Sequence, residues 1–127
     1  MTDYSKMSDF EINLRVAEIV VDYDCISRLP YTDMAVHWGD GANWHVFNPC
    51  NNPADAWPII IDNQLSLNNY GDSWEASFEH DEPVGAFGTD ECVTSGIEDK
   101  NPLRALMIAF LMKVEIEYAK IPSERDS

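Results

Sequence analysis

The stretch NPLRALMIAFLMKVEIEYA occupies residues 101–119 and dominates the prediction of the fold. Asn101 can accept a hydrogen bond from an unpaired N–H group at a helix start, and Pro102 suits the first helical position. Apolar side chains then cover nearly the whole circumference: Leu103, Ala105, Leu106, Met107, Ile108, Ala109, Phe110, Leu111, Met112 and Val114. A helix that is apolar nearly all round must be buried on more than one side. We predict that it lies centrally on a sheet, or that its spare face forms a homodimer contact.

The sheet itself is predicted by an earlier segment. From Gln64 to Tyr70 and from Trp74 to Glu79, apolar and polar residues alternate, as they do in strands with one packed face. The intervening pair Gly71-Asp72 is typical of a tight turn. We therefore predict an antiparallel hairpin.

Two further helices are predicted upstream. Ser8-Asp9-Phe10-Glu11 fits a capping box before a broad apolar stripe, so the first helix should run from residue 8 to about residues 22–24. Asn52-Pro53 repeats the cap-plus-proline start. We expect a helix over residues 53–62, distorted at Pro58 because proline cannot donate a backbone hydrogen bond.

Two other segments are less regular. Residues 34–38 and 43–47 form either a short hairpin or an ordered loop packed by Trp38 and Trp44, with core packing favoured for both tryptophans. Residues 80–100 combine six acids with three glycines and a proline, so we predict an acidic loop. A short strand within that loop could draw on Val84, Phe87, Cys92 and Val93. Residues 121–127 should be frayed.

These elements define the predicted fold class. The order is helix, short β segment, helix, hairpin, acidic loop and helix, and no repeat or linker divides the chain. We predict an α+β protein, one domain over residues 1–127, in which three helices pack a small antiparallel sheet.

Charge is the most unusual property of the chain. Its 127 residues include 23 acids and 8 bases, for a formal net charge of −15, and residues 29–99 contain thirteen carboxylates and no Lys or Arg. Such a surface repels nucleic acid phosphates and anionic membranes, so we expect neither as a direct partner. It suits a basic or nucleic-acid-binding protein, and it also suits simple solubility. The candidate binding residues are Glu75, Glu79, Asp81, Glu82, Asp90, Glu91, Glu98 and Asp99.

The cysteines indicate a reducing compartment. Cys25, Cys50 and Cys92 are scattered singly, with no C-x-x-C pair, and the polar N-terminus has no apolar signal segment. No stretch is apolar for long enough to span a membrane. We expect a cytoplasmic protein with reduced thiols.

Three blocks resemble a known family. They are residues 8–19, which include Leu14-Arg15-Val16-Ala17-Glu18, residues 48–63 (NPCNNPADAWPIIIDN) and residues 101–112 (NPLRALMIAFLM). Together they resemble the NinX-like proteins of lambdoid phages and prophages and, more distantly, phage proteins described as α-β-α sandwiches. Residues 25–47 and 80–99 have no counterpart in this resemblance. The resemblance implies a phage or prophage origin and therefore the cytoplasm of a host bacterium.

The resemblance supplies positions and no activity. Its motif positions in this chain are Asp55, Trp57, Asn101, Pro102 and Arg104. The Asp55-Ala56-Trp57 segment marks either a site or a packing unit. In the favoured packing interpretation, Trp57 is wedged between helix and sheet and Asp55 lies in a favourable first helical turn.

Motifs of catalysis are lacking in the sequence. His37, His45 and His80 do not pair with cysteines at zinc-ligand spacing, and His80-Asp81-Glu82 is typical of a solvated turn. There is no G-x-S-x-G elbow, Walker loop or dinucleotide fingerprint. We therefore assign no catalytic residue, metal or cofactor and expect a non-enzymatic protein.

Three hypotheses remain for function. The first is a phage accessory protein that binds a host or phage macromolecule through its acidic surface, with counter-defence or DNA mimicry as its purpose. The second is a small-ligand binder that sequesters a nucleotide through tryptophans and Arg104. The third is an uncharacterised hydrolase with a cysteine or carboxylate site.

Overall fold

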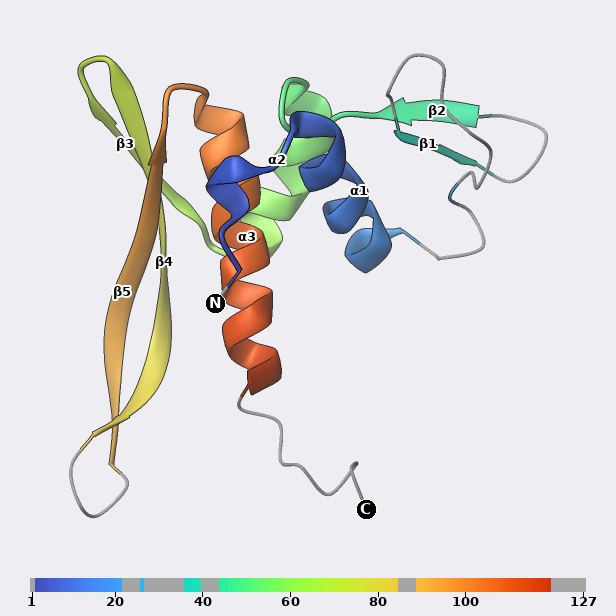
Figure 1. Ribbon diagram of the computed structural model, residues 1–127. Coiled ribbons are helices and arrows are strands. Elements are labelled where there is room, and N and C mark those ends of the chain that lie inside the picture. Colours follow the sequence, from blue (N-terminus) through green and yellow to red (C-terminus); the bar gives the residue numbers. More distant parts are fainter. Residues whose placement is uncertain (1, 22–25, 27–35, 40–43, 85–88, 120–127) are drawn as a thin grey trace, which may run out of the picture.

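A computed structural model describes residues 2–21, 26, 36–39, 44–84 and 89–119, with only the backbone described for 82–84 and 89–90 (Figure 1). The elements, in chain order, are η1 (Tyr4–Lys6), α1 (Asp9–Val20), β1 (Val36–Gly39), β2 (Trp44–Phe47), α2 (Pro53–Asp62), β3 (Ser66–Tyr70), β4 (Ser73–Val84), β5 (Thr89–Asp99) and α3 (Pro102–Ala119). Cys25, Phe87 and the predicted frayed tail lie outside the described residues.

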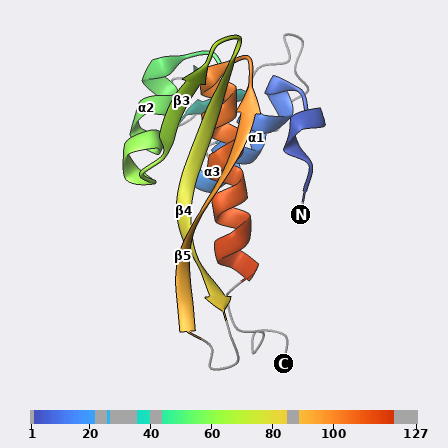
Figure 2. The same ribbon diagram turned by 90° about the vertical axis from the view of Figure 1, so that its left-hand side faces the viewer.

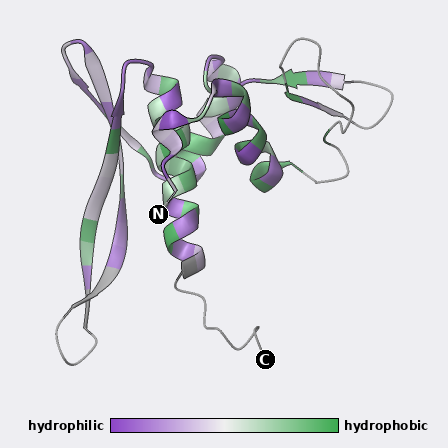
Figure 3. Ribbon diagram, viewed as in Figure 1, coloured by the Kyte–Doolittle hydropathy of each residue, from purple (hydrophilic) through white to green (hydrophobic). Residues whose placement is uncertain are grey.

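The helix α3 is the centre of the molecule. One side of it packs against β4 and β5, and α1 and α2 cover its other side (Figures 1 and 2). Every residue from Ala105 to Leu111 is buried. This double coverage explains why the helix is apolar nearly all round. In Figure 3, hydrophobic residues recur along the length of α3, whereas the tip of the β3–β4 hairpin is hydrophilic.

The main sheet has the order β3-β4-β5 and is antiparallel throughout. Tyr70 pairs with Ser73 across the predicted turn, where Gly71 has a φ of +75°. A positive φ at the first of two turn residues is the type II′ geometry, which glycine adopts without steric cost. All three helices lie on one side of this sheet (Figure 1). The predicted α+β class is confirmed.

The predicted acidic loop over residues 80–100 is wrong. Eleven consecutive residue pairs join β4 to β5, from Trp74 opposite Asp99 to Val84 opposite Thr89. Acidic residues are poor strand formers, so the local composition predicted a loop. Pairing along the full length of β4 overrides that preference. β4 continues five residues beyond the predicted Glu79.

The second, two-stranded sheet confirms the hairpin interpretation of the earlier segment. β1 and β2 are antiparallel, with Val36 opposite Phe47 and Trp38 opposite His45. Trp38 is partly buried and packs against the core, as expected. Trp44 is 47% exposed, so the core packing predicted for it is wrong. It lies opposite Gly39, near the end of the hairpin.

Hydrogen bonds at the helix starts confirm the cap at Asn52 and the Ser8 half of the predicted capping box. The Ser8 side chain accepts from the N–H of Glu11 at 3.1 Å, and the Asn52 side chain accepts from the N–H of Ala54 at 3.1 Å. α1 ends at Val20, slightly before the predicted range, and α2 spans the predicted residues with Pro58 inside it.

The end of α2 sets where β3 begins. The N–H of Gln64 donates to Ile61 O at 3.3 Å, and the N–H of Leu65 donates to Ile60 O at 3.1 Å. Gln64 has a φ of +54°. This is a Schellman end, which stops the helix and delays the strand to Ser66.

No helix in the described part of the chain is both long and apolar enough to cross a membrane.

Candidate functional site

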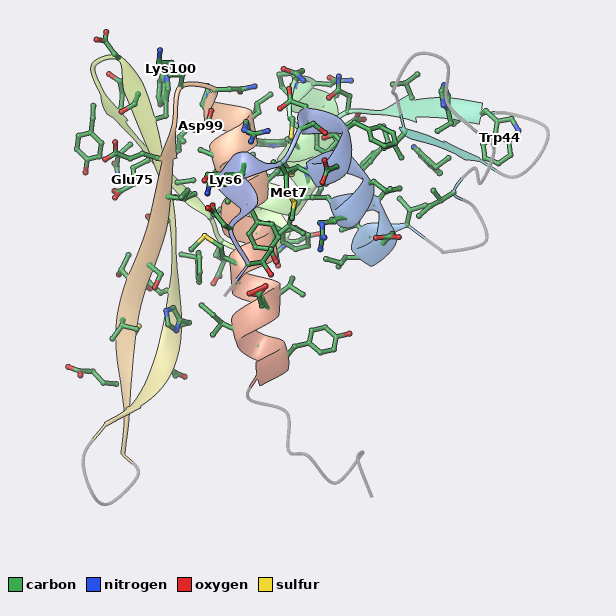
Figure 4. All side chains as sticks on the ribbon, in the orientation of Figure 1. Lys6, Met7, Trp44, Glu75, Asp99 and Lys100 are labelled. Atoms are coloured by element: carbon green, nitrogen blue, oxygen red, sulfur yellow. The ribbon has the colours of Figure 1, made fainter. Side chains whose placement is uncertain are left out.

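The face of the β3-β4-β5 sheet that points away from α3 is open (Figures 1 and 2). Residues directly opposite in an antiparallel pair share a face. Glu75 is opposite Glu98, Glu79 is opposite Thr94, and Asp81 is opposite Cys92. The open face therefore carries the side chains of Glu75, Glu79, Asp81 and Glu98, which we call the acidic sheet face. Figure 4 shows Glu75 on this side of the sheet.

Like charges oppose each other on the acidic sheet face. The hydroxyl of Tyr70 donates to Glu75 Oε1 at 3.3 Å, and the Ser73 hydroxyl donates to Glu98 Oε2 at 3.2 Å. The charge of Glu75 raises the pKa of Tyr70, with smaller contributions from desolvation, the hydrogen bond and Glu98. Two carboxylates directly opposite each other destabilise a sheet. The Glu75–Glu98 pair is therefore not explained by stability.

The other predicted acidic residues are placed differently. Glu91 is exposed and lies opposite Glu82. By strand alternation, this register position belongs to the other side of the sheet from the acidic sheet face. Asp90 is opposite Pro83, and for Glu82 and Asp90 only this backbone register is described. Asp99 lies beside the start of α3 (Figure 4), where it forms an ion pair.

Arg104 is the partner of Asp99 and the centre of a second polar cluster. Its Nε donates to Asp99 Oδ2 at 3.0 Å and its Nη1 donates to Asp9 Oδ1 at 2.7 Å. Its Nη2 donates to the carbonyls of Ser5 and Met7, at 3.1 and 2.6 Å. The side chain is only 12% exposed. Burial opposes its charge, but the bonds to Asp9 and Asp99 outweigh burial and raise the pKa of Arg104.

Asparagines extend this cluster to α1 and α2. Asn13, 5% exposed, donates through Nδ2 to Asn48 Oδ1 at 2.8 Å and accepts from the N–H of Cys50 at 3.0 Å. Asn101 Nδ2 donates to the Cys50 carbonyl at 2.7 Å, while its Oδ1 caps α3 by accepting from Leu103 N at 3.0 Å.

We call this network the Asn–Arg clasp. It comprises Asp9, Asn13, Asn48, Cys50, Asn51, Asp99, Asn101 and Arg104. It joins the starts of α1 and α3, the end of β5 and the segment before α2. Sequence reasoning missed Asp9, Asn13 and Asn48 as members. The available signal was Asn13 itself, an amide between the apolar residues of the α1 stripe.

Asp55 connects α2 to the clasp. Its Oδ2 accepts from the N–H of Asn48 at 2.9 Å and from Asn52 Nδ2 at 3.3 Å. The packing predicted for Trp57 is wrong: the residue is 61% exposed and is not wedged between helix and sheet. α2 turns Ala56 and Ile59 to the core, and that choice leaves Trp57 in solvent.

The segments in which we saw a family resemblance therefore meet in one network. The model of the family described as "Bacteriophage P22, NinX" matches residues 3–114. This chain belongs to the bacteriophage P22 NinX family. The match spans the clasp, the acidic sheet face and both segments that the resemblance left without a counterpart. No curated protein and no solved structure matches the chain.

The described residues of this NinX-family chain offer little for metal or thiol chemistry. They contain no group of three or more His, Cys, Asp or Glu residues arranged to hold a metal ion. Burial raises the pKa of Cys50 to about 12, with Asp9 adding to the effect. Its thiol therefore stays protonated at neutral pH and is a poor nucleophile. Cys92 is exposed and pairs with Asp81 on the acidic sheet face.

Proposed function

We propose that this NinX-family protein acts in the host cytoplasm, without catalysis, by binding a basic or nucleic-acid-binding protein through the acidic sheet face. The observation that carries the proposal is the opposed pair Glu75 and Glu98 on a face that none of the described helices covers. Charges that oppose each other at a cost to stability are favourable once a cationic surface covers them. Within the described part of the chain, neither Glu75 nor Glu98 forms an ion pair with Lys or Arg.

The dimensions of the hairpin suit a DNA-binding partner. From Ser73 to Val84, β4 covers roughly 36 Å at about 3.3 Å per residue. One turn of B-DNA is about 34–36 Å long. The carboxylates of the acidic sheet face extend along β4 from Glu75 to Asp81, about 20 Å at the same rise, so a protein groove that follows phosphates over part of one turn could follow them. DNA mimicry in counter-defence is our specific version of the proposal.

The test is affinity capture from bacterial lysate with rising salt, read by mass spectrometry. The face variant carries Glu75→Gln, Glu79→Gln and Glu98→Gln. The control variant removes the same charge from exposed helical positions through Glu11→Gln, Glu18→Gln and Glu117→Gln. We expect wild type and control to release the same nucleic-acid-binding proteins at moderate salt, and the face variant to lose them. Equal capture by both variants would refute a role for this face.

Nucleotide binding has less support. Arg104, the cation that hypothesis needs, is 12% exposed and already paired with Asp9 and Asp99. The groove beside Trp38 is lined by Asp55 and Asp62, which would repel phosphate. Thermal shift against nucleotides tests this alternative, since a ligand at 100 times its Kd would stabilise the fold by about 2.7 kcal/mol.

Hydrolysis has one observation in its favour. His80 Nε2 lies 2.8 Å from Ser95 Oγ across β4 and β5, a distance suited to a base and a nucleophile. However, Ser95 is not among the residues that line the hollow beside His80. If this alternative were correct, Ser95→Ala would abolish an esterase activity of the purified protein.

A homodimer through α3 remains a prediction. The middle of the helix is buried within the chain, so a contact would have to use its last turns, where Tyr118 is 61% exposed. Sedimentation of wild type and Tyr118→Ala would test it.

A further inference from the structure

The helix α2 is apolar on two sides, although only one side faces the core. Ala56 and Ile59 are buried. On the opposite side, an exposed stripe follows the i, i+3, i+4, i+7 spacing of one helix face: Ala54, Trp57, Pro58 and Ile61. Trp57 is 61% exposed and Ile61 is 54% exposed. Neighbouring large apolar groups left in solvent mark a contact surface more often than they serve the fold.

The stripe borders a groove. A hollow of about 550 Å3 lies between α2, the end of α1 and the β1–β2 hairpin. Ala54 and Pro58 form part of its α2 wall. The opposite wall is apolar and consists of Val20, Val21, Trp38 and Phe47. Stripe and groove therefore form a continuous apolar surface, with Trp57 and Ile61 at its outer flank.

The charged residues beside this surface indicate the sign of the charge that its partner should carry. Asp55 and Asp62 line the groove, and the described residues of its lining include no Lys or Arg. Across the described part of the chain, neither carboxylate forms an ion pair with a basic side chain. A bound segment with Lys or Arg next to its apolar residues would complement both carboxylates.

We propose that the exposed stripe of α2 and this groove dock an amphipathic helix of another protein, with Lys or Arg flanking its apolar face. A helix presents apolar anchors at the spacing of the stripe, as in helix-in-groove recognition. An added strand would need an open strand edge, whereas the groove is walled by side chains. A second copy of α2 would bring Asp55 and Asp62 against the same carboxylates, so the charges disfavour self-pairing.

This inference is independent of the acidic sheet face, which belongs to another side of the molecule and contains no exposed tryptophan among its described residues. Trp57 should be the main anchor, since tryptophan dominates binding energy where it is buried at the centre of an interface. Its exposure in the unbound chain also means that its replacement should leave the fold intact.

The experiment uses a fluorescently labelled synthetic 16-residue peptide with Leu at i, i+3, i+4 and i+7 and Lys at most other positions. Binding to the full chain is followed by anisotropy in 0.15 M salt. One control peptide has the same composition with the Leu order scrambled, so its charge is unchanged. A second control replaces Lys with Glu. We expect the amphipathic Lys peptide to bind at least tenfold more tightly than either control.

Variants of the chain complete the test. Trp57→Ala should weaken binding at least tenfold, and Ile61→Ser about threefold. Tyr118→Ala removes an equally exposed aromatic from α3 and should have no effect. The variant Glu75→Gln, Glu79→Gln, Glu98→Gln should also bind normally, which separates this surface from the proposed function. Far-UV circular dichroism confirms that each variant is folded.

Two results would overturn the inference. One is equal binding of the scrambled peptide, because the attraction would then be charge alone. The other is a wild-type dimer that Trp57→Ala converts to monomer, because the occupant would then be a second copy.

Discussion

Glu98 and Asp99 are consecutive residues of β5 with the same charge, yet they belong to different regions of the molecule. Glu98 lies on the open acidic sheet face, opposite Glu75. Asp99 points to the other side of the strand, is 21% exposed and bonds Arg104 at 3.0 Å. Strand alternation alone separates them. Carboxylates therefore stabilise this protein in the clasp and destabilise it on the acidic sheet face.

The comparison shows how a chain of net charge −15 stays folded. Asp9 and Asp99 are paired with Arg104, and Asp55 accepts hydrogen bonds from the N–H groups of Asn48 and Asn52. The surplus is confined to surfaces where water screens it. The charge of Glu75 and Glu98 is thus available for binding, whereas the charge of Asp9 and Asp99 in the clasp is not.

The largest effect should come from removing the cation of the clasp. Arg104→Met leaves two partly buried carboxylates and the carbonyls of Ser5 and Met7 without their donor. We expect a loss of about 3 kcal/mol in the free energy of unfolding, measured by urea denaturation. Arg15→Met, at an exposed position of α1, is the control and should cost less than about 0.5 kcal/mol. Equal losses would mean that the clasp does not stabilise the fold.

A smaller effect is expected for Asn101→Ala. This change removes the N-cap of α3 and the donor to the Cys50 carbonyl. Together these two losses should lower the free energy of unfolding, measured by urea denaturation, by about 1–2 kcal/mol. In Asn101→Ser the hydroxyl can again cap α3, but it is too short to reach the Cys50 carbonyl. This variant should therefore recover only part of the lost free energy of unfolding. Full recovery would assign the effect to the cap alone.

The consecutive carboxylates Glu98 and Asp99 offer the most direct test of the difference between the acidic sheet face and the clasp. Asp99→Asn weakens the bond to Arg104 and should cost about 1 kcal/mol. Glu98→Gln relieves the repulsion from Glu75 and should stabilise by about 0.3 kcal/mol. Chemical denaturation at low salt measures both, and the signs should be opposite. A loss of stability in both variants would contradict the division into two regions.

The smallest effect concerns Tyr70. Its pKa is raised mainly by the charge of Glu75, so the folded state holds the phenolic proton more tightly than the unfolded state. The resulting stability is present below the ordinary pKa of tyrosine and is lost as the pH rises through the raised value. NMR titration of ring-labelled tyrosine should show the Tyr70 pKa falling towards 10.0 in Glu75→Gln. Added salt should lower it in the wild type as well, because the charge effect is screened.

Local signals predicted much of the fold. Caps at Ser8, Asn52 and Asn101 and the turn at Gly71 located the helix starts and the β3–β4 hairpin. These features depend on residues a few positions apart, so the chemistry that creates them is present in a short sequence window.

The features that escaped prediction all depend on distant partners. β5 pairs with β4 despite its acidic residues, and pairing partners cannot be read from composition. The contact between Arg104 and Asp9 joins positions 95 residues apart. For α2, both helix faces are apolar, so periodicity could not indicate whether Trp57 or Ile59 would be buried.

By itself, the sequence determined the helices, their caps, the β3–β4 hairpin, the α+β class and the excess of negative charge, because propensity, capping and composition are local or additive quantities. Only the tertiary structure decided which carboxylates are paired and which share an open face, and which side of α2 meets the core. Those outcomes follow from packing against α3, which buries one face of each element and leaves the other in water.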